Sequence, residues 1–277
     1  MSVPKIIHYC WFSDLNKKNK GFPKDVNYCI ETWKNILKDY RIIEWNQSNF
    51  DISKSPLYVQ EAYNSGKYAF VSDYVRVWAL FNYGGIYLDT DVEVYKDFDE
   101  FLNSKGFFGF ETTKHIGTCI LASESHNSLF YEILQEYGNK RFIKENGEYD
   151  ETPNPSLLTN KLLEKGLALN NQYQKVDDFD IYPMDYFCPF NPYRESGSCF
   201  SKRTVINHHF SGSWKTPSEL RIGQIRRFCK KRFGDRIGWG IARIICIPFY
   251  FRSRIDNYGC KSTLKYYLRK INKRKRN

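Results

Sequence analysis

Two aspartates separated by one residue are the side chains of this sequence best suited to chemistry. Asp89 and Asp91 follow a double glycine, Gly84 and Gly85, and the apolar residues 86–88. Residues two apart on a β-strand point to the same side, so the two carboxylates would lie roughly 7 Å apart. Carboxylate oxygens suit a hard divalent cation such as Mg²⁺ or Mn²⁺. Buried neighbours would make such a partner necessary, because an unpaired charge away from water is costly.

A cation at Asp89 and Asp91 suggests one use in particular, the handling of a nucleoside diphosphate. The cation would bridge the two phosphates and stabilise the charge that develops as the diphosphate leaves an activated sugar. The double glycine would permit a tight chain reversal next to it. Two alternatives stay open at this point. The carboxylates could be the acid–base pair of a glycosidase, or a solvated strand end without a function.

A second pair, Asp73 and Arg76, has the i, i+3 spacing that places both side chains on one face of a helix. Aspartate can hold sugar hydroxyls, and the arginine fork can hold phosphate oxygens. On spacing alone, an ordinary surface ion pair worth about 0–1 kcal/mol is the simpler explanation.

The third group of candidates is a histidine pair, His208 and His209, followed by residues 210–214 (FSGSW). A cation held by one or two carboxylates needs further ligands, and imidazole is a common one. Side chains alternate along a strand, so only one histidine of the pair should face such a site. The alternative is a buried histidine that bonds to the backbone.

The elements that must position these residues can be read from hydrophobic spacing and stop signals. Helical spacing predicts helices over residues 25–37, 57–63, 69–83, 129–137 and 157–164. Apolar and β-branched runs predict strands over residues 3–12, 41–45, 86–95, 107–110, 116–122 and 205–210. Helices that alternate with strands predict an α/β sandwich with a mainly parallel sheet.

The charge is distributed unevenly along the chain. Residues 221–277 hold 18 of the 42 Lys and Arg but only 2 of the 31 Asp and Glu, so the tail carries +16 and residues 1–220 carry −5. Such asymmetry predicts a polyanionic partner for the tail. Apolar residues recur in the tail at helical spacing, which favours association with an anionic membrane surface. A helical cap with a solvated face and a nucleic-acid binder are the alternatives.

The eight cysteines and the first residues bear on the compartment. The cysteines form no CxxC pair, and residues 1–20 contain no apolar stretch of the kind that signal peptides have. No segment reaches the roughly 20 apolar residues that a membrane-spanning helix needs. We therefore expect a reducing, cytoplasmic location without disulfides.

Residues 67–76 (KYAFVSDYVR), Leu80 and residues 83–91 (YGGIYLDTD) together resemble the donor-binding region of glycosyltransferase family 32. Residues 3–8 and Trp11 resemble the opening strand of that family. The family contains α-1,6-mannosyltransferases, α-1,4-galactosyltransferases and bacterial capsule enzymes. The resemblance is dense over residues 67–95, thinner to residue 215 and absent beyond.

The resemblance implies a GT-A fold, a mainly parallel mixed sheet flanked by helices. It also implies a nucleoside-diphosphate sugar as donor, with a UDP-sugar favoured over a GDP-sugar, Mn²⁺ or Mg²⁺ as cofactor, and retention of the anomeric configuration. Asp91 would be the principal metal ligand, and Asp89 would contact the donor with or without the metal. Asp73 and Arg76 would hold the donor sugar and its phosphates, which makes these four the catalytic candidates.

Further donor contacts follow from the same resemblance. Trp11 would stack on the base, and Tyr87, Ser213 and Trp214 would complete the donor site. His209 fits the H-x-x-G pattern of the metal loop best, with His208 as second choice. One position departs from the family, because Asn154 stands where many relatives have glycine before a helix. Asparagine tolerates a positive φ, so we expect the turn to persist there.

These observations predict a catalytic domain over residues 1–220 and a basic, membrane-associating extension over residues 221–277. No residue is a convincing covalent nucleophile, which favours a same-face route for the transfer. The expected acceptor is a glycan or a lipid-linked saccharide in surface polysaccharide synthesis, at the inner face of the membrane. No nucleic acid is expected as a partner.

Overall fold

The computed structural model describes residues 2–13, 21–192, 197–212 and 215–274. The chain divides into two units, residues 1–211 and residues 212–277. The composition changes only at residue 221, after the first helix of the second unit has begun. That helix, α7 (Pro217–Ile245), starts with a capping box in which Thr216 and Glu219 bond each other's backbone N–H groups.

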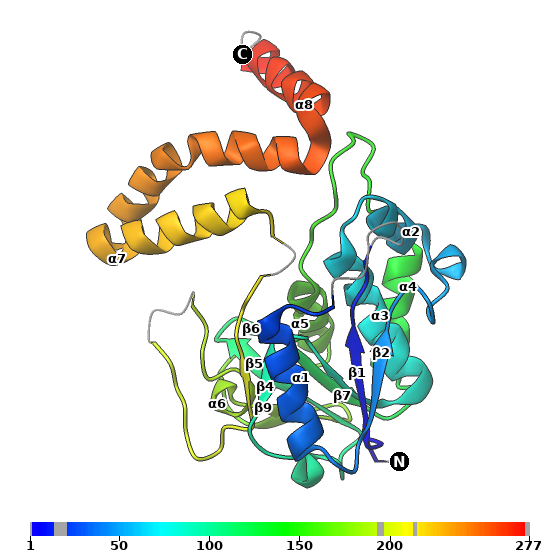
Figure 1. Ribbon diagram of the computed structural model, residues 1–277. Coiled ribbons are helices and arrows are strands. Elements are labelled where there is room, and N and C mark those ends of the chain that lie inside the picture. Colours follow the sequence, from blue (N-terminus) through cyan, green and yellow to red (C-terminus); the bar gives the residue numbers. More distant parts are fainter. Residues whose placement is uncertain (1, 14–20, 193–196, 213–214, 275–277) are drawn as a thin grey trace. The chain divides into compact units, whose positions relative to one another are not determined.

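The first unit is built on one mixed sheet with the strand order β2-β1-β3-β7-β5-β9-β8, with β6 paired to β5 (Figure 1). Five strands run parallel: β1 (Ile6–Cys10), β2 (Arg41–Trp45), β3 (Gly85–Leu88), β5 (Gly106–Thr112) and β9 (Phe179–Tyr182). Antiparallel partners are β7 (Ile120–Ser123), between β3 and β5, the edge strand β8 (Gln174–Val176) and the short β6 (His115–Ile116). The predicted α/β fold, a mainly parallel mixed sheet flanked by helices, is confirmed.

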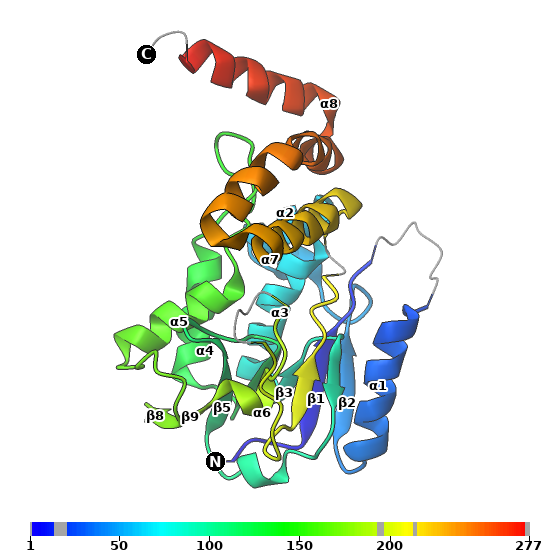
Figure 2. The ribbon, with the colours of Figure 1, turned by 90° about the vertical axis from the view of Figure 1, so that its left-hand side faces the viewer.

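Helices cover both faces of this sheet, as Figure 2 shows for α1 on one side and α3 and α4 on the other. The helices of the first unit are α1 (Lys24–Ile36), α2 (Leu57–Asn64), α3 (Tyr68–Tyr83), α4 (Ser128–Gly138), α5 (Asn154–Glu164) and α6 (Met184–Phe187), with 3-10 turns η1 (Ile52–Lys54) and η2 (Asp99–Phe101). The five helices predicted for this unit therefore form, within a few residues of the predicted bounds.

Alternation along β3 divides its side chains between two cores. Ile86 and Leu88 pack in the core that contains α1, whereas Tyr87 packs in the core of α2, α3 and α4. All three side chains are almost fully buried. Burial on both faces fixes the register of β3, because a slip of one residue would exchange the two sets. The packing of β3 therefore fixes the position of Asp89, the residue that follows the strand.

The carboxyl ends of β1 and β3 meet at one edge of the sheet. The two strands are parallel neighbours, with His8 paired to Tyr87. Trp11 directly follows the first strand and Asp89 the second. In open α/β sheets, ligands bind at this edge of the parallel strands.

Two strand predictions need correction, and two strands were not predicted. The strand predicted over residues 86–95 is interrupted by a turn at residues 89–91 and resumes as β4 (Val92–Val94), which pairs with β10 (Ile206–His208) in a separate two-stranded sheet. The strand predicted over residues 116–122 is two short strands, β6 and β7. Strands β8 and β9 have no counterpart among the predicted elements.

The second unit is helical, as the spacing of its apolar residues predicted. It consists of α7 (Pro217–Ile245) and α8 (Ile247–Arg274). A glycine with positive φ breaks each into two segments, Gly234 (φ 74°) in α7 and Gly259 (φ 77°) in α8. Among the described helices, none is both long enough and apolar enough to cross a membrane.

Candidate functional site

A turn, rather than a continuous strand, brings the two aspartates together. The backbone N–H of Asp89 donates to the Cys119 carbonyl at 2.9 Å, and Val92 N–H donates to the Asp89 carbonyl at 3.1 Å. The chain thus reverses over residues 89–91 and leaves both carboxylates at the carboxyl edge of β3. Ligand atoms of Asp89, Asp91 and His208 all lie within 4.8 Å of one another.

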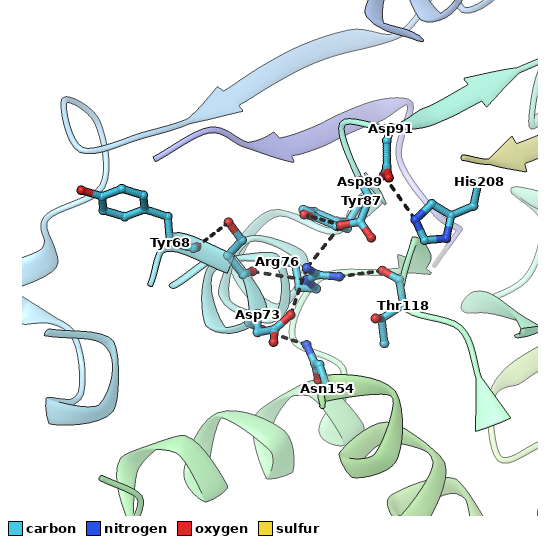
Figure 3. A network of polar contacts seen from close by, with 10 residues as sticks. Tyr68, Asp73, Arg76, Tyr87, Asp89, Asp91, Thr118, Asn154 and His208 are labelled. Carbon is cyan, nitrogen blue, oxygen red and sulfur yellow. Dashed lines mark hydrogen bonds and ion pairs between the residues drawn. The ribbon is translucent and has the colours of Figure 1, made fainter. Parts of the chain in front are cut away.

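His208 reaches this turn because β10 is paired antiparallel to β4. The register places His208 opposite Val92, and the backbone N–H of His209 donates to the Asp91 carbonyl at 3.0 Å. The imidazole Nε2 of His208 lies 3.2 Å from the Asp91 Oδ1 (Figure 3). Sheet pairing thus brings together two residues more than a hundred positions apart in the chain.

His209 points elsewhere. Its Nε2 lies 3.0 Å from the Oε2 of Glu93. The Tyr95 hydroxyl donates to the same oxygen, and the Tyr28 hydroxyl donates to Oε1 of that carboxylate. Strand alternation sends the two histidines to opposite sides, as expected. The geometry favours His208 as the metal ligand, the alternative that the H-x-x-G spacing ranked second.

The chain after the histidines closes back on Asp91. Phe210 has a positive φ of 53°, an uncommon conformation for a bulky residue, and its ring stacks near the His208 ring with centroids 4.0 Å apart. This bend turns the backbone N–H of Ser211 toward the Asp91 Oδ2, at 2.8 Å. Asp91 is therefore oriented by contacts at both carboxylate oxygens.

The electrostatics of Asp91 and His208 make them a charge pair. Burial works against the charge on Asp91, but the hydrogen bond and charge of His208 outweigh it, so the pKa of Asp91 is lowered. Burial also disfavours the protonated form of His208. The neighbouring Cys119 and Asp91 outweigh this effect, so the pKa of His208 is raised. Burial raises the pKa of the Cys119 thiol to about 12. Cys119 is therefore neutral at pH 7, and Asp91 supplies the stabilising charge.

The donor set fits a divalent cation. Two carboxylates and one imidazole, all partly accessible, offer three ligands that converge on one point. Mn²⁺ and Mg²⁺ accept carboxylate oxygens, Mn²⁺ also accepts imidazole, and both ions keep further positions for phosphate oxygens or water. A cation there would also relieve the mutual repulsion of Asp89 and Asp91.

Arg76 joins the candidates of helix α3 to the aspartate turn. Its Nη2 lies 3.0 Å from the Asp73 Oδ1 and 3.2 Å from the Asp89 Oδ1. Its Nη1 donates to the Thr118 carbonyl at 2.8 Å, and its Nε donates to the Ser72 carbonyl. Figure 3 shows the guanidinium at the centre of this network. The surface ion pair that spacing alone favoured is therefore wrong, because Asp73 and Arg76 belong to a buried ion-pair network.

The burial of Arg76 limits what the residue can do. Its side chain is 7% exposed, and its guanidinium lies 4.5 Å from the centre of the Tyr87 ring. The Tyr87 hydroxyl donates to the same Asp89 Oδ1, at 3.0 Å. Arg76 and Tyr87 thus orient Asp89, and the donor groups of Arg76 are largely taken by the protein itself.

Asp73 is held between α3 and α5. Burial raises the pKa of its carboxyl to about 6, although the Arg76 charge opposes this rise. The Asn154 side chain donates from Nδ2 to the Asp73 carbonyl at 3.0 Å. Asn154 begins α5 and is not among the described residues with positive φ, so the expected positive-φ turn is absent there. Its amide instead fixes α5 to the site.

Of the remaining predicted donor contacts, the structure describes Trp11 but not Ser213 and Trp214. Trp11 is partly buried at the carboxyl edge, with its ring edge-on to Phe22 at 5.2 Å. Ser213 and Trp214 lie outside the described residues.

Two groups that bond to the predicted residues were not themselves predicted, the Thr118 carbonyl and the Glu93 carboxylate. The alternating acids at positions 89, 91 and 93 were the available signal for Glu93.

The double glycine before the turn is required by space as well as by dihedral angle. Gly84 (φ 65°) and Gly85 (φ 105°) both lie in the left-handed region. A Cβ on Gly85 would come within 2.6 Å of the Ile6 carbonyl oxygen. The buried His8 holds the Gly84 carbonyl through Nε2 at 2.8 Å and accepts a hydrogen bond from Trp45 at Nδ1.

Comparison with known families matches the region that contains both aspartates. Residues 23–108 match the family model described as the glycosyltransferase sugar-binding region containing a DXD motif. The aspartate turn, the double glycine and helix α3 all fall inside this match. The chain therefore carries a DXD-type glycosyltransferase region, and its resemblance to glycosyltransferase family 32 is confirmed.

Individual relatives agree with this assignment. An uncharacterized glycosyltransferase, L373, of Acanthamoeba polyphaga mimivirus is 26% identical over 223 residues, which are 76% of this chain and 84% of that protein. Inositol phosphoceramide mannosyltransferase 1 of Schizosaccharomyces pombe is 28% identical over 158 residues, 51% of this chain and 46% of that protein. The match thus spans less than half of the fission-yeast protein. Among solved structures, the PaToxG glycosyltransferase has a TM-score of 0.43 at 19% identity, covering 60% of this chain and 70% of that one.

Proposed function

We propose that this protein is a divalent-cation-dependent, retaining glycosyltransferase that moves a hexose from a nucleoside-diphosphate sugar to a hydroxyl group. A UDP-sugar is the favoured donor. One observation carries the proposal: Asp89, Asp91 and His208 converge at the carboxyl edge of the sheet, and the two aspartates lie within the sugar-binding region. That edge is where α/β sheets hold nucleotides.

The proposed roles follow from the contacts of each side chain. Asp91 and His208, with Asp89, would hold the cation, which when bound supplies positive charge to the leaving diphosphate. Arg76 keeps Asp89 and Asp73 in place from inside the protein. Asp73 and Asp89 border the donor sugar, and Trp11 stacks on the base. Ser213 and Trp214 complete the donor site in this proposal.

The proposed stereochemistry rests on how the carboxylates are engaged. Asp73 and Asp89 both pair with Arg76, and Asp91 pairs with His208, which weakens each as a nucleophile. We therefore favour a same-face transfer. The bond from the anomeric carbon to the phosphate oxygen breaks, and the acceptor oxygen attacks from the same side. The acceptor proton passes to the departing phosphate oxygen, which leaves the protein unchanged.

The proposed acceptor is a glycan or a lipid-linked saccharide in surface polysaccharide synthesis. The fission-yeast relatives are named inositol phosphoceramide mannosyltransferases, which supports an acceptor that carries a lipid. The proposed location is peripheral, at the inner face of the membrane, where a cytoplasmic donor and a lipid-linked acceptor meet.

A thermal-shift screen tests the donor and the metal together. A true nucleotide-sugar donor should raise the melting temperature only when Mn²⁺ or Mg²⁺ is present, because binding to the folded state stabilises it. UDP-sugars should give the largest shift. Equal stabilisation with and without metal would contradict the cation-bridged diphosphate, and hydrolysis of a glycoside without any nucleotide would favour a glycosidase.

Matched substitutions test the assigned ligands. Asp91→Asn should abolish transfer and leave the fold intact. His208→Ala should lower the metal affinity by roughly 100-fold or more, whereas His209→Ala should change it little. Metal titration of the two histidine variants measures the difference. A larger loss for His209→Ala would reverse the assignment of the ligand.

A further inference from the structure

The second unit presents a stripe of apolar side chains to solvent. The stripe consists of Ile237, Ile241, Ile244, Pro248 and Phe251, spaced four, three, four and three residues apart. Side chains at this spacing share one helix face. Ile237 is 65% exposed, Ile244 70% and Phe251 45%, whereas Ile241 between them is partly buried. We call this set the outer stripe. A helix in water normally turns such a face inward.

The outer stripe is continuous across the junction of α7 and α8. Cys246 N–H donates to the Ala242 carbonyl and Tyr250 N–H to the Cys246 carbonyl, both at 2.9 Å, so helical hydrogen bonding continues there. The opposite face of the helix is packed. Ala242 and Cys246 are buried, and a Cβ on Gly238 would come within 2.4 Å of the Cys229 carbonyl oxygen. The helix therefore packs with one face and exposes an apolar stripe on the other.

Basic side chains flank the outer stripe. Arg236 and Arg243 are exposed two helical turns apart, and Arg243 lies over the ring of the exposed Trp239, 5.6 Å from its centre. Lys231 and Arg232 are exposed on the preceding segment of α7, before the break at Gly234. An apolar helix face with arginines on its flank is the arrangement of helices that lie in a membrane interface.

Charge and apolar area together select one class of partner. A second copy of the chain would bring two units of charge +16 together, which like-charge repulsion opposes. A nucleic acid would neutralise the charge but leave the outer stripe in water. An anionic lipid surface satisfies both, because it attracts Lys and Arg and accepts apolar side chains below its headgroups.

We propose that the outer stripe and its flanking basic residues bind the surface of an anionic membrane, with the helix lying in the plane of the interface. This docking concerns the second unit and does not depend on the proposed transfer reaction.

Flotation of the full chain with lipid vesicles tests the apolar part of the surface. The protein should float with phosphatidylcholine vesicles that contain phosphatidylglycerol, and less so as salt is added. Ile237→Ser with Ile244→Ser should reduce the bound fraction at least about tenfold, because two isoleucine side chains that would be buried in the membrane are lost. Leu57→Ser with Leu163→Ser, at residues 54% and 41% exposed in the first unit, is the matched control and should bind normally.

A second pair of variants separates local charge from net charge. Lys231→Glu, Arg232→Glu and Arg236→Glu together should abolish binding to the anionic vesicles. The control has the same number of charge reversals at exposed lysines of the first unit, Lys38→Glu, Lys114→Glu and Lys202→Glu. This control should keep most of the binding to anionic vesicles. Asp91→Asn should bind like the unchanged protein, so a failure of the transferase proposal would not imitate a failure of this one.

Three results would overturn the membrane proposal. Equal flotation with neutral and anionic vesicles would remove the role of charge. Salt-sensitive binding of a random RNA duplex without any flotation would assign the surface to a nucleic acid. Concentration-dependent self-association that Ile237→Ser and Ile244→Ser abolish, again without flotation, would make it an interface between copies.

Discussion

At the scale of single residues, the site depends on a buried arginine. Arg76 contacts Asp73 and Asp89 with one nitrogen, and it reaches the Ser72 and Thr118 carbonyls with the others. A guanidinium can serve four oxygens at once because its donors form a rigid planar fork. Removing it would leave two carboxylates without their common partner.

Arg76→Met should therefore lower the free energy of unfolding by about 3–5 kcal/mol, because breaking a buried pair strands its partner charges. Arg141→Met, at an exposed arginine that pairs with Glu61, is the comparison and should lower the free energy of unfolding far less. Urea denaturation measures both. A loss below 1 kcal/mol for Arg76→Met would show that the network does not support the fold.

His8 provides a residue-scale prediction about pH. Burial lowers its pKa to about 4, and its two hydrogen bonds fix the neutral tautomer with the proton on Nε2. Between the ordinary pKa near 6.5 and the folded value, the unfolded chain binds a proton that the folded chain does not. Stability therefore falls as the pH drops through this window, by on the order of 3 kcal/mol for this residue.

Nitrogen NMR of the His8 ring checks this directly. The ring should stay neutral, protonated at Nε2, down to the pH at which the protein unfolds. Titration of His8 near pH 6.5 in the folded protein would contradict the buried, hydrogen-bonded position.

The residue types of the site were largely predictable, and their pairing was not. Asp73, Arg76, Asp89 and Asp91 stand out by type and spacing. The choice between His208 and His209 depends on the register of β10 against β4, which a sequence of two adjacent histidines does not contain. The burial of Arg76 likewise depends on contacts with Thr118, which lies on a different segment.

At the scale of elements, the double glycine before β3 sets the position of the aspartate turn. Helix α3 ends at Gly84, and Gly85 begins β3 with its Cα close to the backbone of β1. The left-handed angles and the close approach act at the same residue, so any side chain there adds both strain and a clash.

Gly85→Ala should therefore destabilise the protein by at least about 2 kcal/mol and reduce transfer, because β3 must shift away from β1. Gly138→Ala is the matched control, since Gly138 has ordinary helical angles and no atom within 4 Å of an added Cβ. It should change stability by less than about 1 kcal/mol. Thermal unfolding of both variants measures the contrast, and equal effects would contradict the packing argument.

Long amphipathic elements were predictable, and short ones were not. Helix α3 and strand β2 match their predicted ranges to within a residue. Strands β8 and β9 have three and four residues, too few for a period to emerge, and they meet at a hairpin where Asp177 takes a positive φ of 50°. The turn at residues 89–91 was predicted as strand because it lies in a run rich in β-branched and aromatic residues, whereas tertiary contacts bend it.

At the scale of the whole molecule, charge and fold separate along the chain. The first unit carries the sheet and the candidate site, and the second carries most of the excess positive charge. The change in charge predicted a boundary after residue 220, whereas the second unit begins at Gly212, because its helix cap lies in a neutral stretch. Composition shows where the charge changes, which need not coincide with the residue at which a helix begins.

A chain that ends at Leu220 should distinguish the roles of the two units. If the second unit concentrates the enzyme at a membrane, transfer to a water-soluble acceptor should change by less than about threefold, whereas transfer to a lipid-linked acceptor in anionic vesicles should fall at least about tenfold. Equal losses with both acceptors would indicate that the second unit supports the site itself.

The most direct test of the proposed site is anomalous scattering from crystals of the full chain grown with Mn²⁺ and a nucleoside diphosphate. We predict one manganese peak bonded to Asp91 and His208, close to Asp89 and bridging to the diphosphate. A bound diphosphate with no manganese at these side chains, or with manganese at His209 and Glu93, would contradict the assignment.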